Sequence, residues 1–210
     1  MTILKFKLKF AQTLLFLILL LFISASAFCQ SFDKNLAEVA RLFEGGKHAD
    51  LLARLQGLKA SAELNDLRLF LEAEALKNLG RKAEALALYE RIVSQFPDGE
   101  SAFQSQMPRF MLQLETAADE NSAVRLEKKA SELATPWQRG TAMVKLSELP
   151  FLSGARKSRF ALNAVRQFRS DSTFYRQAPA CHDLRKKILQ NPEQYQFIDE
   201  EWVEILLSAS

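Results

Sequence analysis

The stretch NLGRKAEALALYERIVSQFP, residues 78–97, decides the fold class of this 210-residue chain. Gly80 interrupts an apolar pattern near the start of the stretch, and Pro97 ends it. Between them Ala85, Tyr89 and Ile92 recur at the spacing of one face of an α-helix. Gly is favoured just beyond a helix C-terminus, and Pro cannot continue a helix. The stretch therefore predicts the turn and second helix of a helical hairpin.

The same pattern occurs 34 residues earlier, in RLFEGGKHADLLARL around Gly46. Five further positions match in side-chain type when the two copies are aligned: Val39 with Ala73, Leu42 with Leu76, Lys47 with Arg81, Leu51 with Ala85 and Leu55 with Tyr89. A 34-residue period with a helix on each side of a glycine is the spacing of tetratricopeptide repeats.

The second copy, residues 66–99, resembles the tetratricopeptide-repeat (TPR) family in its exported bacterial form. The residues that carry the resemblance are Leu69, Ala73, Leu76, Leu79, Gly80, Ala85, Tyr89 and Pro97. Ala73 and Ala85 are small where two helices must approach closely, and Tyr89 can fill the gap towards the next hairpin. The resemblance implies antiparallel helical hairpins that stack into a short solenoid.

A third, divergent helix pair is expected in residues 100–135, because such arrays need about three pairs to bury their faces. Its first apolar stripe is Phe103, Met107, Phe110, Met111 and Leu114, and its second is Ala123, Leu126, Ala130 and Leu133. The turn between them is expected at residues 118–121. Pro108 should either kink the first helix or delay its start.

After Thr135-Pro136 the 34-residue period disappears, but helices are expected around residues 138–149, 155–169, 181–189 and 199–207. In the last of these, Ile198, Trp202, Ile205 and Leu206 form a stripe that could cover the open end of the array. No segment has the alternation and turn signals of a strand. We therefore predict an all-α protein with TPR-like hairpins over residues 28–135 and a basic helical region, packed on the array, over residues 136–210.

Residues 1–27 have the pattern of a secretory signal peptide. Lys5, Lys7 and Lys9 precede an apolar run at residues 14–23, and small side chains follow up to Ala27. We expect cleavage after Ala27 and a secreted or periplasmic protein. Two alternatives are an uncleaved membrane anchor and a lipid-modified Cys29. A disulfide between Cys29 and Cys181 is a further possibility in an oxidising compartment.

The charge pattern differs between the two halves of the expected mature chain. Residues 1–27 hold three of the 28 basic residues and none of the 25 acidic ones, so cleavage leaves a neutral chain. This balance gives no argument for nucleic-acid binding. Residues 138–190, however, carry eleven Lys and Arg against three acids. The candidate basic surface is Arg156, Lys157, Arg159 and Arg166, which could dock on the acidic half, face an anionic polymer or membrane, or be ordinary solvated helix faces.

The sequence offers no convincing catalytic or metal centre. His48 and His182 are too few and too far apart for a metal cluster, and the adjacent Cys181 and His182 would point about 100° apart on a helix. Glu100-Ser101 resembles the Glu-Ser motif of lytic transglycosylases, but the Gly-Leu-Met-Gln stretch of that family does not follow. Carboxylates also favour helix N-termini. We expect no catalysis and no cofactor.

The leading functional hypothesis is an exported scaffold or adaptor that binds a protein or peptide. In the TPR family the first helix of each hairpin lines the binding groove. The residues that this resemblance assigns to the groove are Asp33, Leu36 and Ala40 in the first copy and Leu67, Phe70, Glu74, Lys77 and Asn78 in the second. The alternatives are an accessory region of a peptidoglycan-acting enzyme, which would touch the cell wall or an anionic envelope surface, and an assembly lipoprotein.

Overall fold

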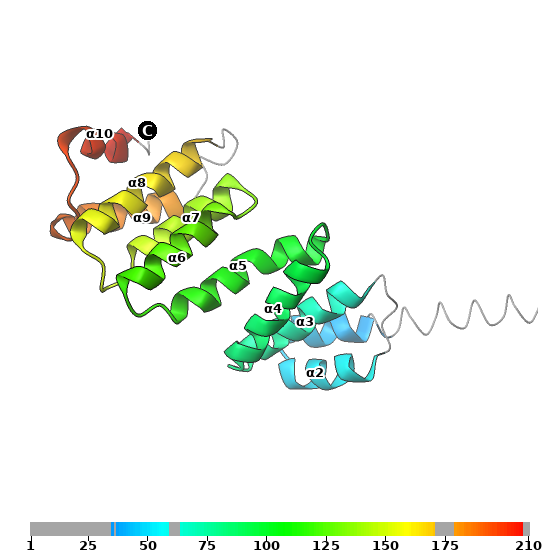
Figure 1. Cartoon of the computed structure of the whole chain (residues 1–210). Coiled ribbons are helices and arrows are strands. Elements are labelled where there is room, and N and C mark those ends of the chain that lie inside the picture. Colours follow the sequence, from blue (N-terminus) through cyan, green and yellow to red (C-terminus); the bar gives the residue numbers. More distant parts are fainter. Residues whose placement is uncertain (1–34, 36, 59–63, 171–178, 208–210) are drawn as a thin grey trace, which may run out of the picture. The chain divides into compact units, whose positions relative to one another are not determined.

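The computed structural model describes residues 35, 37–58, 64–170 and 179–207, and every regular element in these ranges is helical (Figure 1). No strand occurs in them, so the predicted all-α class is correct for the part of the chain that is described. The chain divides into two compact units, residues 1–59 and 60–210, which we describe separately. Within the described ranges, none of the helices combines the length and hydropathy needed to cross a membrane.

The first unit contains one helical hairpin. A helix over residues 37–44 is followed by a turn at Gly45–Gly46 and by α2, His48–Gly57. Five apolar side chains of the two helices are buried: Val39, Leu42, Leu51, Leu52 and Leu55. An ion pair between Arg54 and Glu38, 2.8 Å apart, also joins the two helices.

The second unit begins with a hairpin of α3, Asn65–Asn78, and α4, Lys82–Gln95. The small residues Ala73 and Ala85 are completely buried, as are Tyr89 and Ile92. Small side chains let the two helix axes approach closely, and the large side chains fill the space beside them. Leu79, which belongs to the TPR-like pattern, is instead 41% exposed at the end of α3.

The turns of the two hairpins repeat each other at an interval of 34 residues. Gly46 and Gly80 have φ values of 65° and 78°, and they are the two glycines with positive φ among the described residues. The amide of the next residue reaches back to the helix in both turns: Lys47 N donates to Leu42 O at 3.0 Å, and Arg81 N donates to Leu76 O at 2.9 Å. The amides of Gly46 and Gly80 donate to Phe43 O and Lys77 O, at 3.1 and 3.0 Å. This pair of bonds is the Schellman motif, which satisfies carbonyls at a helix C-terminus.

α5, Glu100–Glu115, is buried on two opposite faces. Ser105 and Leu112 are seven residues apart and share one face, whereas Phe110 and Leu114 share another; all four are buried. Phe110 and Leu114 belong to the C-terminal hydrophobic core, and α5 also packs extensively against α4. The helix begins at Glu100 and contains Pro108, so of the two outcomes expected for this proline the delayed start does not occur.

The next two helices begin with capping boxes. The side chain of Asp119 accepts from the Ser122 amide at the start of α6, Glu120–Ser131. Thr135 does the same for Gln138 at the start of α7, Pro136–Ser147, where Pro136 occupies the first helical turn. These caps satisfy amides that have no partner within the helix, and so they fix where each helix begins.

The C-terminal helices are α8, Gly154–Ser170, α9, Pro179–Gln190, and α10, Asp199–Leu207, with a short 3-10 turn at Pro192–Gln194. The contact between α7 and α8 is the most extensive of the unit. It depends on Gly140, because a Cβ there would lie 2.7 Å from the ring of Phe168. An aromatic cluster of Tyr195, Phe197 and Trp202 packs against the core, with ring centroids 5.7 and 5.0 Å apart.

Three residues of the predicted apolar stripes are exposed: Phe103, Ile198 and Leu206, of which Leu206 is 41% exposed near the end of α10. Phe103 is 40% exposed because it lies one helical turn or more before the part of α5 that meets the C-terminal core. Ile198 is 62% exposed because α10 begins only at the next residue, while Ile205 of the same stripe is completely buried. The stripe Ala123, Leu126, Ala130 and Leu133 is buried throughout.

Gly80→Ala should destabilise the protein by about 1–2 kcal/mol, because a side chain raises the energy of the left-handed backbone conformation. No atom lies within 4 Å of the added Cβ, so the cost would come from the backbone alone. Chemical denaturation measures the change. Gly57→Ala is the matched control, because Gly57 lies in a helix with open space around it. This substitution should leave the stability of the protein unchanged or raise it. Equal effects of both substitutions would contradict this account of the turn.

Candidate functional site

Two of the predicted groove residues on α3 take part in a network inside the hairpin. One oxygen of the Glu74 carboxylate accepts from the Tyr89 hydroxyl at 2.5 Å, and the other accepts from Lys77 Nζ at 2.5 Å. Burial raises the pKa of Tyr89, and the neighbouring Glu74 carboxylate raises it further. Tyr89 therefore stays protonated and donates to Glu74. The contact with Tyr89 joins α3 to α4, and the two contacts together leave the carboxylate less available to a partner.

The other three predicted groove residues on α3 are more accessible or differently engaged. Leu67 is 36% exposed near the start of α3, and Asn78 is exposed at its end, where its side chain donates to Glu74 O. Phe70 is half-buried, with its ring 6.3 Å from that of Tyr89. In the first copy, Ala40 is exposed, and Asp33 and Leu36 lie outside the described residues.

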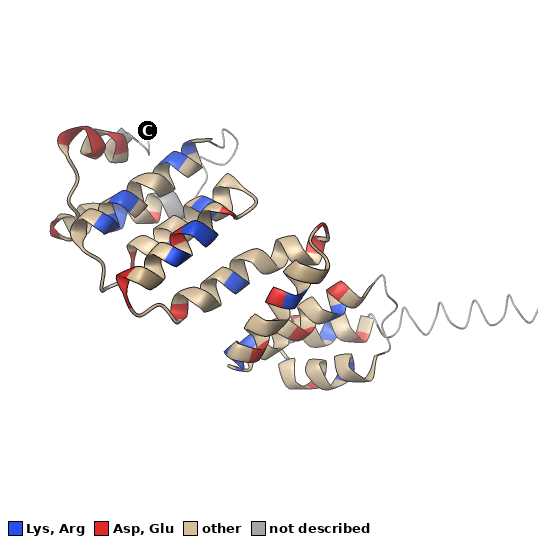
Figure 2. Ribbon diagram, viewed as in Figure 1, with Lys and Arg blue, Asp and Glu red and all other residues tan. Residues whose placement is uncertain are grey.

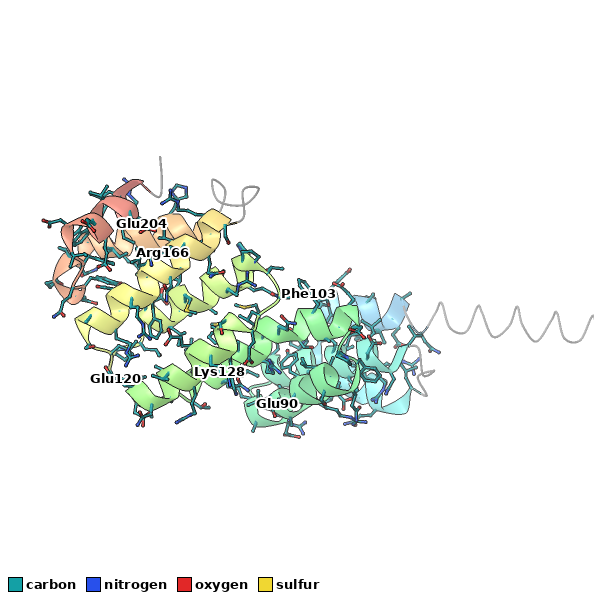
Figure 3. The ribbon with its side chains drawn as sticks, turned by 45° about the horizontal axis from the view of Figure 1, so that its top comes forward. Glu90, Phe103, Glu120, Lys128, Arg166 and Glu204 are labelled. Carbon is teal, nitrogen blue, oxygen red and sulfur yellow. The ribbon has the colours of Figure 1, made fainter. Side chains whose placement is uncertain are left out.

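The predicted basic surface is partly neutralised by acids from other helices. Arg159 pairs with Glu127 of α6 at 2.5 Å. Arg166 and Arg169 of α8 both lie close to Glu204 of α10, at 3.2 and 3.9 Å (Figures 2 and 3). Glu127 and Glu204 lie outside residues 138–190, so acids from the rest of the chain compensate part of the basic excess. These exposed pairs each contribute little to stability.

A polar cleft of about 340 Å³ lies between α7 and α9. It is lined by Thr141, Val144, Lys145, Glu148, Asp183, Lys186, Lys187 and Gln190. Glu148 receives Lys187 at 2.5 Å on one oxygen and Lys145 at 3.0 Å on the other. Burial raises the pKa of Glu148, but the two lysines outweigh burial and hold that pKa below its usual value. Glu148 therefore remains charged and neutralises part of the lining.

Sequence reasoning did not find this cleft, although it identified the basic stretch that contains it. Lys145 and Glu148 are three residues apart on one helix, which is a readable signal for a surface pair. The packing of α9 against α7 cannot be predicted in this way, because no repeat fixes which face of α9 meets α7. No sequence pattern indicated that Thr141 would line a cleft.

The residues considered for catalysis do not come together. Glu100 begins α5, where its carboxylate accepts from Gln104 at 3.0 Å. His182 is exposed on α9, and His48 is half-buried at the start of α2 rather than fully exposed as a surface residue. In the described ranges no three His, Cys, Asp or Glu side chains are grouped as metal ligands. The possible Cys29–Cys181 bond and the predicted signal peptide both involve residues outside those ranges.

Comparison of the sequence with protein-family models, with curated proteins and with solved structures gave no match.

The Glu74–Tyr89 contact can be tested with a double-mutant cycle. Tyr89→Phe removes a hydrogen bond to a partly buried carboxylate and should cost about 1.5–3 kcal/mol. In a Glu74→Gln background the same change should cost less, since the charged acceptor is gone. Urea denaturation measures all four proteins. Glu84→Gln, which removes an exposed pair with Arg81 at the start of α4, is the control and should leave stability nearly unchanged. A Tyr89→Phe cost independent of residue 74 would contradict the proposed network.

Proposed function

We propose that this protein is an exported, non-catalytic TPR-like adaptor that holds a protein or peptide partner. The observation that carries the proposal is the repeated helix–glycine–helix turn, in which the backbone hydrogen bonds and the buried positions recur after 34 residues. Hairpins that repeat at this interval stack because one hairpin alone cannot bury its apolar face.

The contacts within residues 60–210 support stacking of this kind. Alternate helices touch along the chain: α3 contacts α5, α5 contacts α7, and α7 contacts α9. In a helical solenoid, helices in equivalent positions of successive hairpins lie beside each other and line one extended surface. We therefore assign the partner surface to α3, α5, α7 and α9.

On this surface α3 contributes both apolar and polar residues. Leu67 is exposed and Phe70 and Leu71 are half-buried, while Glu74 and Lys77 are engaged with each other. Apolar residues surrounded by polar ones favour an amphipathic partner segment. This narrows the groove hypothesis to Leu67 and Phe70, with Asn78 at the edge.

Export is the second part of the proposal and rests on the charge and apolar pattern of residues 1–27. Intact mass measurement of the protein recovered from its host tests it. Cleavage after Ala27 gives a mature chain that begins at Phe28. A mass that includes residues 1–27 would contradict cleavage, and an added lipid mass on Cys29 would favour the assembly-lipoprotein alternative.

The adaptor proposal predicts that Leu67→Glu weakens partner capture at least about fivefold, as expected for an interface residue worth about 1 kcal/mol. The measurement is quantitative mass spectrometry after crosslinking in cells and affinity purification of the tagged full chain. Val124→Glu on α6 is the matched control, because Val124 is 44% exposed on a helix outside the proposed surface. Equal recovery of the partner with the Leu67→Glu and Val124→Glu variants would contradict the assignment of α3 to the interface.

A peptidoglycan-associated accessory region is the second candidate. In the described part of the chain, the side chains of Arg156 and Lys157 have no ion pair, unlike Arg159 and Arg166. Salt-sensitive co-sedimentation with purified peptidoglycan, lost in Arg156→Glu/Lys157→Glu and retained in Leu67→Glu, would favour this candidate over the adaptor.

A further inference from the structure

We propose that α10 is a replaceable internal ligand: the place that it occupies on α8 also accepts an acidic amphipathic helix of a partner protein, which displaces α10. The inference goes beyond the adaptor surface assigned to α3, α5, α7 and α9, because it concerns other helices and does not depend on that surface. It is carried by the way α10 is attached and by the side chains that α10 presents to α8.

The attachment of α10 buries few side chains. Its principal contact with another helix is with α8, beside which it lies (Figure 1). Among its described side chains only Ile205 is completely buried, as part of the C-terminal hydrophobic core, whereas Val203 and Leu206 are 53% and 41% exposed. A helix of nine residues is only marginally stable in water by itself. The helical state of α10 therefore depends on this one-sided contact.

The polar part of the contact is a carboxylate that meets a guanidinium. Arg166 Nε and Nη2 each lie 3.2 Å from a different oxygen of Glu204, and Arg169 Nη1 lies 3.9 Å from one of them (Figure 3). Two N–H groups in this arrangement select a planar acceptor with two oxygens, although the distances exceed the about 2.7–2.9 Å of a strong charged pair. Both arginines are more than half exposed, so water and salt weaken the pair. The pair therefore gives selectivity without making the attachment permanent.

The chain that precedes α10 is anchored independently of it. The Gln196 amide donates to Ser158 Oγ at 2.7 Å, and the stacked rings of Tyr195 and Phe197 pack against the core. Ile198, which directly precedes α10, is 62% exposed. A change of backbone conformation at residue 198 would release α10 from α8 while the anchors stay in place. Local opening of this kind leaves the other helices of the unit folded.

The side chains of α10 show which partner chemistry the site accepts. Trp202 and Ile205 are three residues apart, share one helix face and both pack against the core, and Glu204 beside them meets Arg166. A competing helix needs a carboxylate, a branched apolar residue directly after it and a large apolar residue two positions before it. Its tether gives α10 an effective concentration on the order of millimolar. A partner helix that its own protein already holds folded loses less freedom on docking, which offsets the tether.

The test is an NMR titration of the ¹⁵N-labelled full chain with an unlabelled capped peptide, Ac-DEEWVEILL-NH2, which has the sequence of residues 199–207. Because only the chain is labelled, displacement should move the amide signals of α10 to the positions of an unfolded segment. The matched peptide carries Ile205→Asp and should bind at least about tenfold more weakly, since it lacks the buried apolar group. Without peptide, amide hydrogens of α10 should exchange faster than those of α8, because α10 opens locally.

Substitutions in the full chain separate the internal ligand from the site. Ile205→Asp should release α10 and raise the affinity for the unmodified peptide at least about tenfold, because the internal competitor is gone. Glu204→Gln should act in the same direction by about two- to fivefold, and it replaces Ile205→Asp if that variant does not fold. In the released chain, Arg166→Glu should weaken the peptide about tenfold, and a peptide with Glu204→Arg should recover binding. Arg156→Glu, the same charge change on α8, is the control and should alter binding less than about twofold.

Three results would overturn the proposal: α10 signals that stay in place at about 10 mM peptide, amide exchange in α10 as slow as in α8, or equal binding of the two peptides. Concentration-dependent dimers that are lost in the Ile205→Asp chain would place α10 of a second copy in the site and so contradict a different partner. Leu67→Glu should leave displacement unchanged. If partner recovery depends on Leu67 while the peptide does not displace α10, the adaptor stands and this inference fails; the reverse result removes only the α3 surface.

Discussion

The hairpin turn at Gly80 is the constraint on which the α3–α4 hairpin depends. This type of turn places Gly80 at a positive φ, which glycine adopts without the penalty of a side chain. The amides of Gly80 and Arg81 then satisfy the last carbonyls of α3, so the helix ends without exposing unpaired groups. With the turn fixed, Ala73 and Ala85 allow close contact of the two helices, and Tyr89 is enclosed between them and Phe70.

On the partner surface proposed above, the residues of α3 assigned to recognition differ from those that stabilise the helix pair. Glu74 joins the two helices of the hairpin through Tyr89 and pairs with Lys77 of its own helix, although the resemblance to the TPR family assigns its position to the groove. Leu67 lies on the same helix and contacts solvent. The cleft between α7 and α9 shows a similar division, since Glu148 joins two helices while Lys186 has no ion pair with any residue that the structure describes. A surface of this kind can change its partner preference without loss of its framework.

The helices could be predicted from the sequence, because their signals lie in neighbouring residues. The candidate site could not be predicted where it depends on contacts between helices that are far apart in the sequence. Helix periodicity, Gly80 and the Thr135-Pro136 cap identify helices from nearby residues alone, so the elements of the C-terminal region lie within a few residues of their expected ranges. The exposure of Phe103 depends on where α5 meets the distant C-terminal core, which periodicity cannot show. The pairing of Arg166 with Glu204 and the shielding of Thr141 depend in the same way on how α8 meets α10 and how α7 meets α9.

The two buried faces of α5 have a consequence for how this part of the chain unfolds. Leu112 and Ser105 are covered on one face, while Phe110 and Leu114 complete the C-terminal core on the other. Unfolding of α5 would therefore expose apolar surface on both of its sides at once. Neither the helices before α5 nor those after it could cover that surface. In repeat proteins, such shared interfaces transmit stability from one unit to the next. Residues 60–210 should consequently behave as one cooperative folding unit, in which a substitution in α3 or α4 changes the protection of amide hydrogens in α7 and α8.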